Sequence, residues 1–316
     1  MNFTPLDFSR IRTYPLRERD NKVNRDALAR PWQPGASFAA FVESLPHILV
    51  GNDFRAIVNA TATAVRNKRP VLVMMGAHPI KCGLNPVLID LMQHGVISAL
   101  AFNGAAAIHD FELALIGATS EDVQHGLDDG SFGMIDETGR QMNRALADGV
   151  AQGIGAGRAL GEAIVKGTFP CKQLSLLQQG VTGNVPVTVH IAIGTDIIHQ
   201  HPTADGAVLG ESTYLDFQKL ASVIAQLEGG VVLNIGSAVI MPEVFLKALT
   251  IARNLGNTVD HFTTATFDMN RHYRPTENVV RRPTHKGGHG YYVVGHHELL
   301  VPLWAAAVLE EVASSK

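Results

Sequence analysis

The stretch Pro70-Val-Leu-Val-Met-Met-Gly76-Ala-His-Pro-Ile-Lys-Cys-Gly83 decides the fold. Its apolar run does not alternate with polar residues, which is typical of a strand buried on both faces. A glycine-bearing turn follows, and then Asn85-Pro86 introduces the apolar-periodic segment 87–92. Asparagine caps helices well and proline suits a first helical turn, so we expect a helix to begin here. The stretch therefore predicts a strand–turn–helix unit.

A second stretch, Gly230-Val-Val-Leu-Asn-Ile-Gly236-Ser-Ala-Val-Ile-Met-Pro242, repeats this pattern and leads into another apolar-periodic segment at 244–249. Alternating units of this kind build parallel sheets. The sequence thus predicts an α/β fold with a doubly wound, mostly parallel Rossmann-like sheet that carries helices on both faces.

The remaining elements follow from apolar periodicity and turn residues. We expect further strands at 96–102, 185–193, 260–267 and 291–294, and helices at 38–45, 54–67, 108–117, 215–226, 242–255 and 299–312. Residues 1–36 are polar, Arg-rich and Pro-rich, and are predicted to form an arm that is loosely ordered or laid across a neighbouring subunit. Residues 37–316 are predicted to form a single nucleotide-binding domain.

Composition excludes several classes of protein. The 316 residues are 46% hydrophobic and 17% charged, which suits one large core. A net charge of −3, without a basic stripe, argues against nucleic acid as a partner. The two cysteines form no disulfide framework, and we find neither a signal peptide nor an apolar run long enough for a membrane helix. We therefore expect a cytoplasmic protein with a small-molecule substrate.

Two predicted strand ends carry turns suited to a phosphate or pyrophosphate. They are Asn103-Gly104-Ala105 and Gly236-Ser237, where small residues leave helix N-terminal amides accessible. Any tight turn between a strand and a helix also needs small residues, so a structural role is the alternative. The run Gly153-Ile-Gly155-Ala-Gly157 follows a helical pattern rather than a strand, and is interpreted as a helix-packing face rather than a nucleotide fingerprint.

Histidines provide the candidate catalytic groups. His199 and His201 follow a predicted strand and the Gly-Thr-Asp196 turn. They suit proton transfer or substrate binding, and with Asp196 they also suit Zn²⁺. Glu277 stands in a loop, where a carboxylate is either solvated or orients a substrate cation. A group at 285–297 adds four further histidines.

The segment Gly83-Leu-Asn-Pro-Val-Leu-Ile-Asp-Leu-Met-Gln-His94-Gly-Val-Ile-Ser-Ala-Leu, followed by Gly104 and Asp110, resembles deoxyhypusine synthase. Later motifs fall in the order of that family: Val185-Pro-Val, Gly194-Thr-Asp196, Ile235-Gly236, Arg274-Pro-Thr-Glu277 and Leu300-Val-Pro302-Leu. The resemblance covers residues 50–312. It implies a Rossmann-like fold, NAD as cofactor, and a homotetramer with sites shared between subunits.

The same resemblance implies roles for single residues. Asn103, Gly104 and Ala105 fall on a turn that holds NAD in the family, and Asp196 and Gly236 on further NAD positions. His199 or His201 falls near the active-site histidine of the family. Glu277 falls on the carboxylate that binds the amine.

Departures from the family pattern affect the chemistry. Pro283 occupies the place of the catalytic lysine, and Lys286 lies three residues further along. Ile108-His109 replaces an acidic pair, Arg281 replaces a tryptophan and His296 replaces an aspartate. We therefore do not expect a true deoxyhypusine synthase, and an anionic or neutral substrate is as well suited as a polyamine.

The sequence predicts NAD-dependent oxidation or group transfer on a small substrate, with proton transfer by His199 or His201. Two alternatives stay open. One is a zinc-dependent hydrolase that uses His199, His201 and Asp196, and the other is a non-catalytic nucleotide-binding protein.

Overall fold

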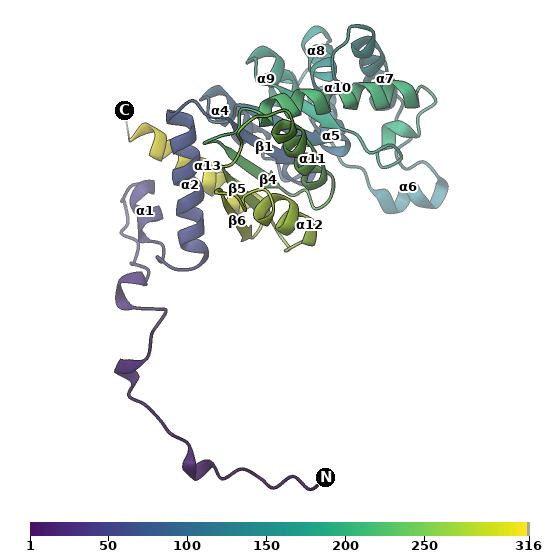
Figure 1. Ribbon diagram of the computed structural model, residues 1–316. Helices are drawn as coiled ribbons and strands as arrows, with labels where there is room; N and C mark the ends of the chain where they lie inside the picture. Colours follow the sequence, from purple (N-terminus) through teal and green to yellow (C-terminus); the bar gives the residue numbers. More distant parts are fainter. Residues whose placement is uncertain (315–316) are drawn as a thin grey trace.

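A computed structural model describes residues 1–314, and a six-stranded, fully parallel sheet forms its centre (Figure 1). The strands are β1 (Val71–Met75), β2 (Ala99–Asn103), β3 (Val187–His190), β4 (Val231–Ile235), β5 (Thr263–Asp268) and β6 (His289–Val294). Their order across the sheet is β3-β2-β1-β4-β5-β6. This is the order of doubly wound dinucleotide-binding sheets, which confirms the predicted fold class.

Helices connect the strands. The longer helices are α1 (Phe38–Ser44), α2 (Val50–Arg66), α4 (Asn85–Gln93), α5 (Gly104–Ile116), α6 (Val123–Asp129), α7 (Asp136–Ala151), α8 (Ala156–Lys166), α9 (Leu176–Thr182), α10 (Gly206–Ile224), α11 (Ile240–Asn254) and α13 (His297–Ala313). Short turns of helix are α3 (His78–Lys81), η5 (Ile197–His199), α12 (Tyr273–Pro275) and η6 (Thr276–Arg281).

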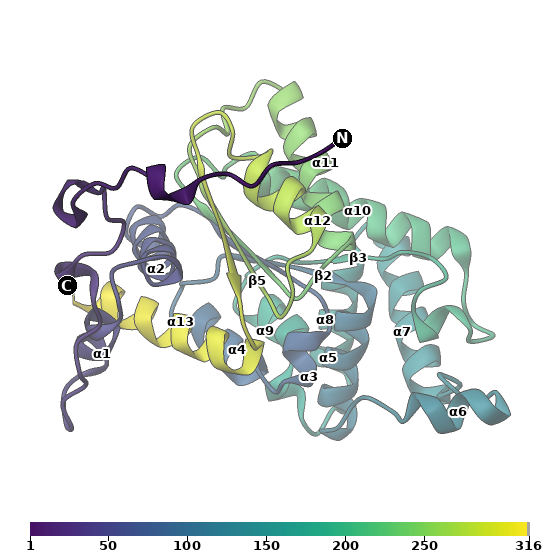
Figure 2. The ribbon, with the colours of Figure 1, turned by 90° about the horizontal axis from the view of Figure 1, so that it is seen from below.

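The sheet divides the core into two layers (Figure 2). On β1, Val71, Val73 and Met75 pack into the larger cluster, which includes residues of α2, α4, α5, α8 and α13. Leu72 and Met74 point to the opposite face and pack against α10 and α11. All five residues are buried, which is why the strand lacks polar alternation in its sequence.

Two helix starts differ from the sequence prediction because side chains have tertiary partners. Asn85 is the first residue of α4 rather than its cap, and its buried amide donates to Asp110 Oδ1 at 2.8 Å. Helix α5 begins at Gly104, directly after β2, and not near Ile108.

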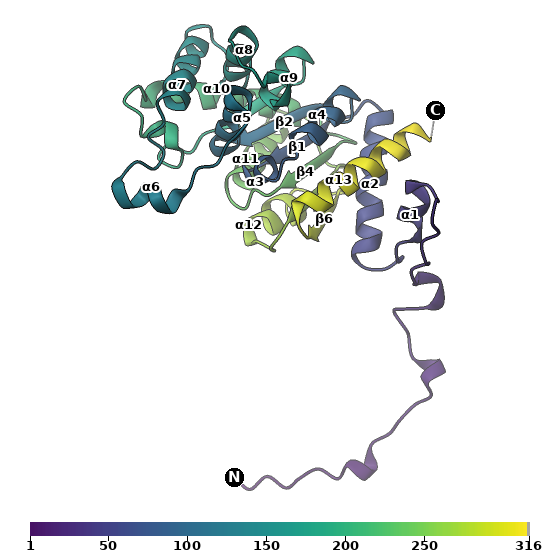
Figure 3. The ribbon, with the colours of Figure 1, turned by 180° about the vertical axis from the view of Figure 1, so that it is seen from behind.

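Residues 1–24 leave the body near α1 as an extended arm with two short turns, η1 (Phe8–Arg10) and η2 (Leu16–Glu18) (Figures 1 and 3). Every side chain of this segment is exposed, including several large apolar ones. A third turn, η3 (Arg25–Ala27), precedes α1. Within residues 1–314, none of the helices combines the length and apolar character that a membrane crossing requires.

Candidate functional site

The turn between β2 and α5 lies at the carboxyl edge of the sheet and carries the predicted Asn103, Gly104 and Ala105. Asn103 caps α5 by accepting a hydrogen bond from the Ala106 N–H at 2.9 Å. The next residue must be glycine, because a Cβ on Gly104 would lie 1.9 Å from Asp196 Oδ2. The turn thus brings Asn103, Gly104 and Asp196 together, although Asp196 follows a different strand.

Asp196 has spare hydrogen-bonding capacity. Its side chain is 4% exposed, and Oδ2 has no hydrogen-bond partner among residues 1–314. Burial raises the pKa of this carboxyl to about 6. A buried carboxylate oxygen without a donor is costly, so Oδ2 can accept a hydrogen bond from a ligand hydroxyl.

A cavity of about 720 Å³ opens beside this turn, between α5, the α6 region and the start of α7. Figures 1 and 3 show α6 projecting from the body at this place. Ala105 and Asp196 line the cavity. Its other polar lining residues are Lys81, His109, Glu112, Thr119, Ser120, Glu121, Glu137, Thr138 and Thr195. Four carboxyl groups against one lysine give the cavity an acidic lining.

A hydrogen-bonded chain of side chains forms one wall of the cavity. His109 Nδ1 lies 2.6 Å from Thr119 Oγ1, and the Thr119 hydroxyl donates to Glu112 Oε2 at 2.5 Å. Thr138 Oγ1 donates to the other oxygen of Glu112 at 3.1 Å. The sequence prediction missed this chain. Its signal was the polar residues His109 and Glu112, which with Asp110 interrupt a helix that is otherwise apolar.

His199 and His201 both support loops through Nδ1. His199 Nδ1 accepts from the Gly194 and Asp196 amides at 3.1 and 3.2 Å, and its Nε2 lies 3.9 Å from Asp196 Oδ2. His201 Nδ1 accepts from the Thr203 amide at 3.2 Å. Among residues 1–314, no group of three His, Cys, Asp or Glu side chains is arranged to hold a metal ion. The zinc alternative therefore gains no support.

Gly236 and Ser237 lie at the same edge of the sheet but at the end of β4, with β1 between them and the β2 turn. Gly236 has a φ of +63°, and a Cβ there would lie 2.8 Å from His297 Cε1. The Ser237 hydroxyl accepts from the Met241 amide at 3.3 Å and so supports the start of α11. The two turns thus face the β1–β4 switch point from either side.

Glu277 lies at the far end of the sheet. It belongs to η6, which packs on β5 and β6, whereas His199 and His201 follow β3 at the opposite end. Arg281 Nη1 donates to Glu277 at 2.9 Å. Within a single subunit, Glu277 therefore does not lie beside His199 and His201.

Lys286 lies at the opposite edge of the sheet from the β2 turn. Its Nζ is 2.8 Å from Asp260 Oδ2, and Asp260 precedes the start of β5. The histidine group is divided in the same way: His285 precedes β6 and His289 begins it, while His296 and His297 follow it. His297 Nδ1 lies 2.8 Å from His78 Nδ1 at the carboxyl edge.

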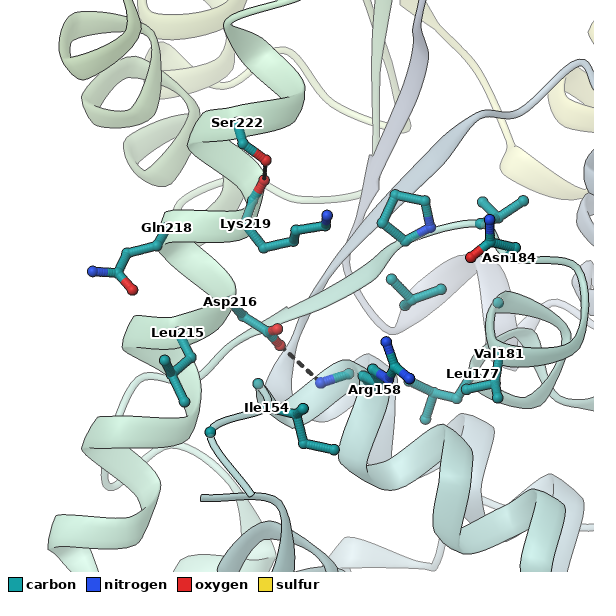
Figure 4. Close-up of a pocket in the computed structure, with 17 residues that line it drawn as sticks. Ile154, Arg158, Leu177, Val181, Asn184, Leu215, Asp216, Gln218, Lys219 and Ser222 are labelled. Atoms are coloured by element: carbon teal, nitrogen blue, oxygen red, sulfur yellow. Dashed lines mark hydrogen bonds between the residues drawn. The ribbon is translucent and has the colours of Figure 1, made fainter. Parts of the chain in front are cut away.

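The glycine run at 153–157 serves close packing, as the sequence analysis interpreted it. A Cβ on Gly157 would lie 2.0 Å from the Val187 carbonyl oxygen, and one on Gly155 would lie 2.0 Å from Asp216 Oδ1. A second cavity of about 670 Å³ borders this contact (Figure 4). Asp216 on α10 lines this cavity, and its Oδ2 accepts a hydrogen bond from the Gly157 amide at 2.8 Å.

No protein-family model matches the chain, and no curated protein matches its sequence. Solved structures share the fold. A protein from Entamoeba histolytica, provisionally named as a deoxyhypusine synthase, is 11% identical over 89% of this chain and 96% of its own, with a TM-score of 0.51. AgrE in complex with ornithine and NAD⁺ is 14% identical over 83% of this chain, with a TM-score of 0.50. The cyanobacterial arginine dihydrolase ArgZ is 17% identical with the same TM-score. The chain spans about a third of the length of ArgZ and AgrE.

Proposed function

We propose that this protein binds NAD at the carboxyl edge of the sheet and oxidises a small amine, without the lysine-linked transfer of deoxyhypusine synthase. The β2 turn is the observation that carries the proposal. There Ala105, in the first turn of the capped helix α5, and the under-bonded carboxyl group of Asp196 line one cavity, and Gly104 packs against that carboxyl group. Helix N-termini bind phosphates, and an acidic residue near such a turn accepts the ribose hydroxyls of NAD.

The residues present fit a dinucleotide. Asn103, Gly104 and Ala105 offer main-chain groups to the pyrophosphate, and Asp196 offers acceptor oxygens to a ribose. Gly236 and Ser237 would border the same ligand across β1. When bound, NAD supplies a hydride acceptor. AgrE, which shares the fold, was crystallised with NAD⁺ and ornithine, and this supports a nucleotide and an amine in a sheet of this kind.

The lining of the cavity favours an amine over the anionic substrate considered from sequence. Glu112, Glu121, Glu137 and Asp196 outnumber Lys81 there. A protonated amine gains Coulomb energy beside these carboxylates, whereas a small anionic substrate among them would be repelled; the NAD pyrophosphate would instead lie at the main-chain amides of the turn. The sequence placed Arg281 and His296 in the pocket by resemblance, but neither lines this cavity.

NADH titration followed by nicotinamide fluorescence tests the nucleotide. We expect saturable binding with a Kd below about 1 mM. Asp196→Asn removes the charged acceptor, and charged hydrogen bonds contribute about 1.5–3 kcal/mol, so affinity should fall by at least about tenfold at pH 8. Asp148→Asn, on the exposed face of α7, is the matched control and should bind like wild type. Absence of binding at millimolar NADH would refute the proposal.

A further inference from the structure

His109 lies on the wall of the cavity beside the β2 turn, and no catalytic role has been assigned to it so far. It lies on α5, five residues after the glycine turn, and its side chain is 14% exposed. It lines the cavity together with Asp196 and Ala105. Its Nδ1 is engaged with Thr119, and its Nε2 has no hydrogen-bond partner among the described residues.

The hydrogen-bond directions fix which nitrogen of His109 carries the proton. The Thr119 hydroxyl has one hydrogen, and it is donated to Glu112 Oε2. Thr119 Oγ1 can therefore only accept from His109, so the imidazole proton is on Nδ1. The Nε2 lone pair is then free.

His199 and His201 have the opposite arrangement. Their Nδ1 atoms accept main-chain N–H groups, so a neutral ring must carry its proton on Nε2. Neither ring can accept another proton without breaking these loop bonds. Of His109, His199 and His201, only His109 has an unused acceptor lone pair beside the cavity.

We propose that His109 presents an unprotonated Nε2 to the cavity and accepts there the proton that the substrate loses, with Thr119 and Glu112 as positioning residues. This step rests on the proposed function. The substrate C–H bond gives its electron pair and hydrogen to NAD⁺ as hydride, and the amine N–H proton passes to His109 Nε2. The imidazolium that forms donates through Nδ1 to Thr119, whose hydroxyl leads to Glu112.

Burial keeps His109 neutral at physiological pH. Burial, and secondarily the positive charge of Lys81 on α3, lower the pKa of His109 to about 4. The other charged groups of the cavity are Glu112 on α5, Glu121 before α6, Glu137 on α7 and Asp196 before η5. A ring that is neutral at pH 7 has its acceptor nitrogen available to a substrate.

Side-chain ¹H–¹⁵N NMR of uniformly labelled full-length protein tests the placement without any substrate. The His109 resonances are assigned by their loss in His109→Gln. We expect a protonated Nδ1 and an unprotonated Nε2 that persist down to about pH 5. Thr119→Val should abolish this tautomer preference, and Thr119→Ser should restore it. A ring protonated on Nε2 in wild type would overturn the proposal.

Turnover tests the chemical role. NADH production is measured with 1,4-diaminobutane and L-ornithine as probes. We expect His109→Gln to retain the NADH affinity of wild type while kcat falls by about 100-fold or more, the usual contribution of a general base. His94→Gln, an exposed histidine at the end of α4, is the control. Unchanged kcat in His109→Gln would exclude His109 as the acceptor. Absence of NADH binding in wild type would refute the nucleotide site instead.

Discussion

Single residues show how much of this sequence serves internal hydrogen bonding rather than a ligand. Asp110, which the sequence marked as a motif residue, is fully buried. Its carboxylate accepts from Ser175 Oγ at 2.6 Å, from the Leu176 and Leu177 amides, and from Asn85. It thus joins α5 to the start of α9. Sequence indicated that Asp110 matters, but its partners are 25 to 67 residues away and could not be predicted.

Asp110→Ala would leave the Leu176 and Leu177 amides and the Ser175 hydroxyl without their acceptor inside the core, while Asn85 keeps its bond to the Leu174 carbonyl. Each unsatisfied buried donor costs about 1–3 kcal/mol, so we expect the variant to lose at least about 3 kcal/mol of unfolding free energy. Asp148→Ala, at an exposed position, should change it by less than about 0.5 kcal/mol. Urea denaturation followed by circular dichroism measures both. A loss near zero for Asp110→Ala would contradict the structural role.

At the level of helices and strands, an apolar pattern predicts the bounds of some strands correctly but not of others. β1 and β4 match their predicted bounds because both are fully buried and almost entirely apolar, Asn234 being the exception. β3 is shorter than the predicted 185–193 because its flanks are held by other elements. Among the described residues no strand pairs with the outer edge of β3, and side chains of α10 accept its free main-chain N–H groups instead. The Val189 amide donates to Asp216 Oδ2 at 2.7 Å, and the amide of Ile191, directly after the strand, donates to Thr213 Oγ1 at 2.9 Å.

Asp216 gives the stability of this edge a pH dependence. Burial raises its pKa from 3.8 to about 7 in the folded state. Its favourable contribution is therefore complete below about pH 4 and is lost as pH rises through 7, because the unfolded state ionises first. Asp216→Asn keeps an acceptor for both amides and cannot ionise. We expect the difference in unfolding free energy between Asp216→Asn and wild type to grow with pH from 4 to 7; a constant difference would show that this carboxyl does not titrate near 7.

On the scale of the whole molecule, the sequence predicted the layers but not the lateral order of the strands. Apolar runs identify buried strands, yet they do not say which strands are neighbours. For this reason the predicted His199, His201 and Glu277 could be placed at one edge, while the structure separates β3 from β5 by three strands and from β6 by four. The grouping of Asn103, Gly104 and Asp196 was anticipated through the family resemblance, which put all three on NAD-binding positions, and the pairing of β2 with β3 explains it.

The arm gives a prediction about assembly. Residues 1–36 contain seven Arg or Lys and four Asp or Glu, a charge of +3, so the remaining residues carry −6 of the total −3. We propose that the exposed apolar and basic arm contacts a second copy of the chain. Deletion of residues 1–24 should leave the unfolding temperature of the isolated body within about 2 °C, since no side chain of that segment is buried. Analytical ultracentrifugation should show a smaller assembly, and an unchanged mass would exclude this role.

The capped edge of β3 also governs how copies of this protein can join. A strand whose amides are already taken by a hydroxyl and a carboxylate offers little to an incoming strand, so the sheet cannot be prolonged from that side into a ribbon. This protection lasts only while α10 stays packed against β3. Heat or denaturant that loosens this helix first would uncover a template for aggregation while most of the core is still intact.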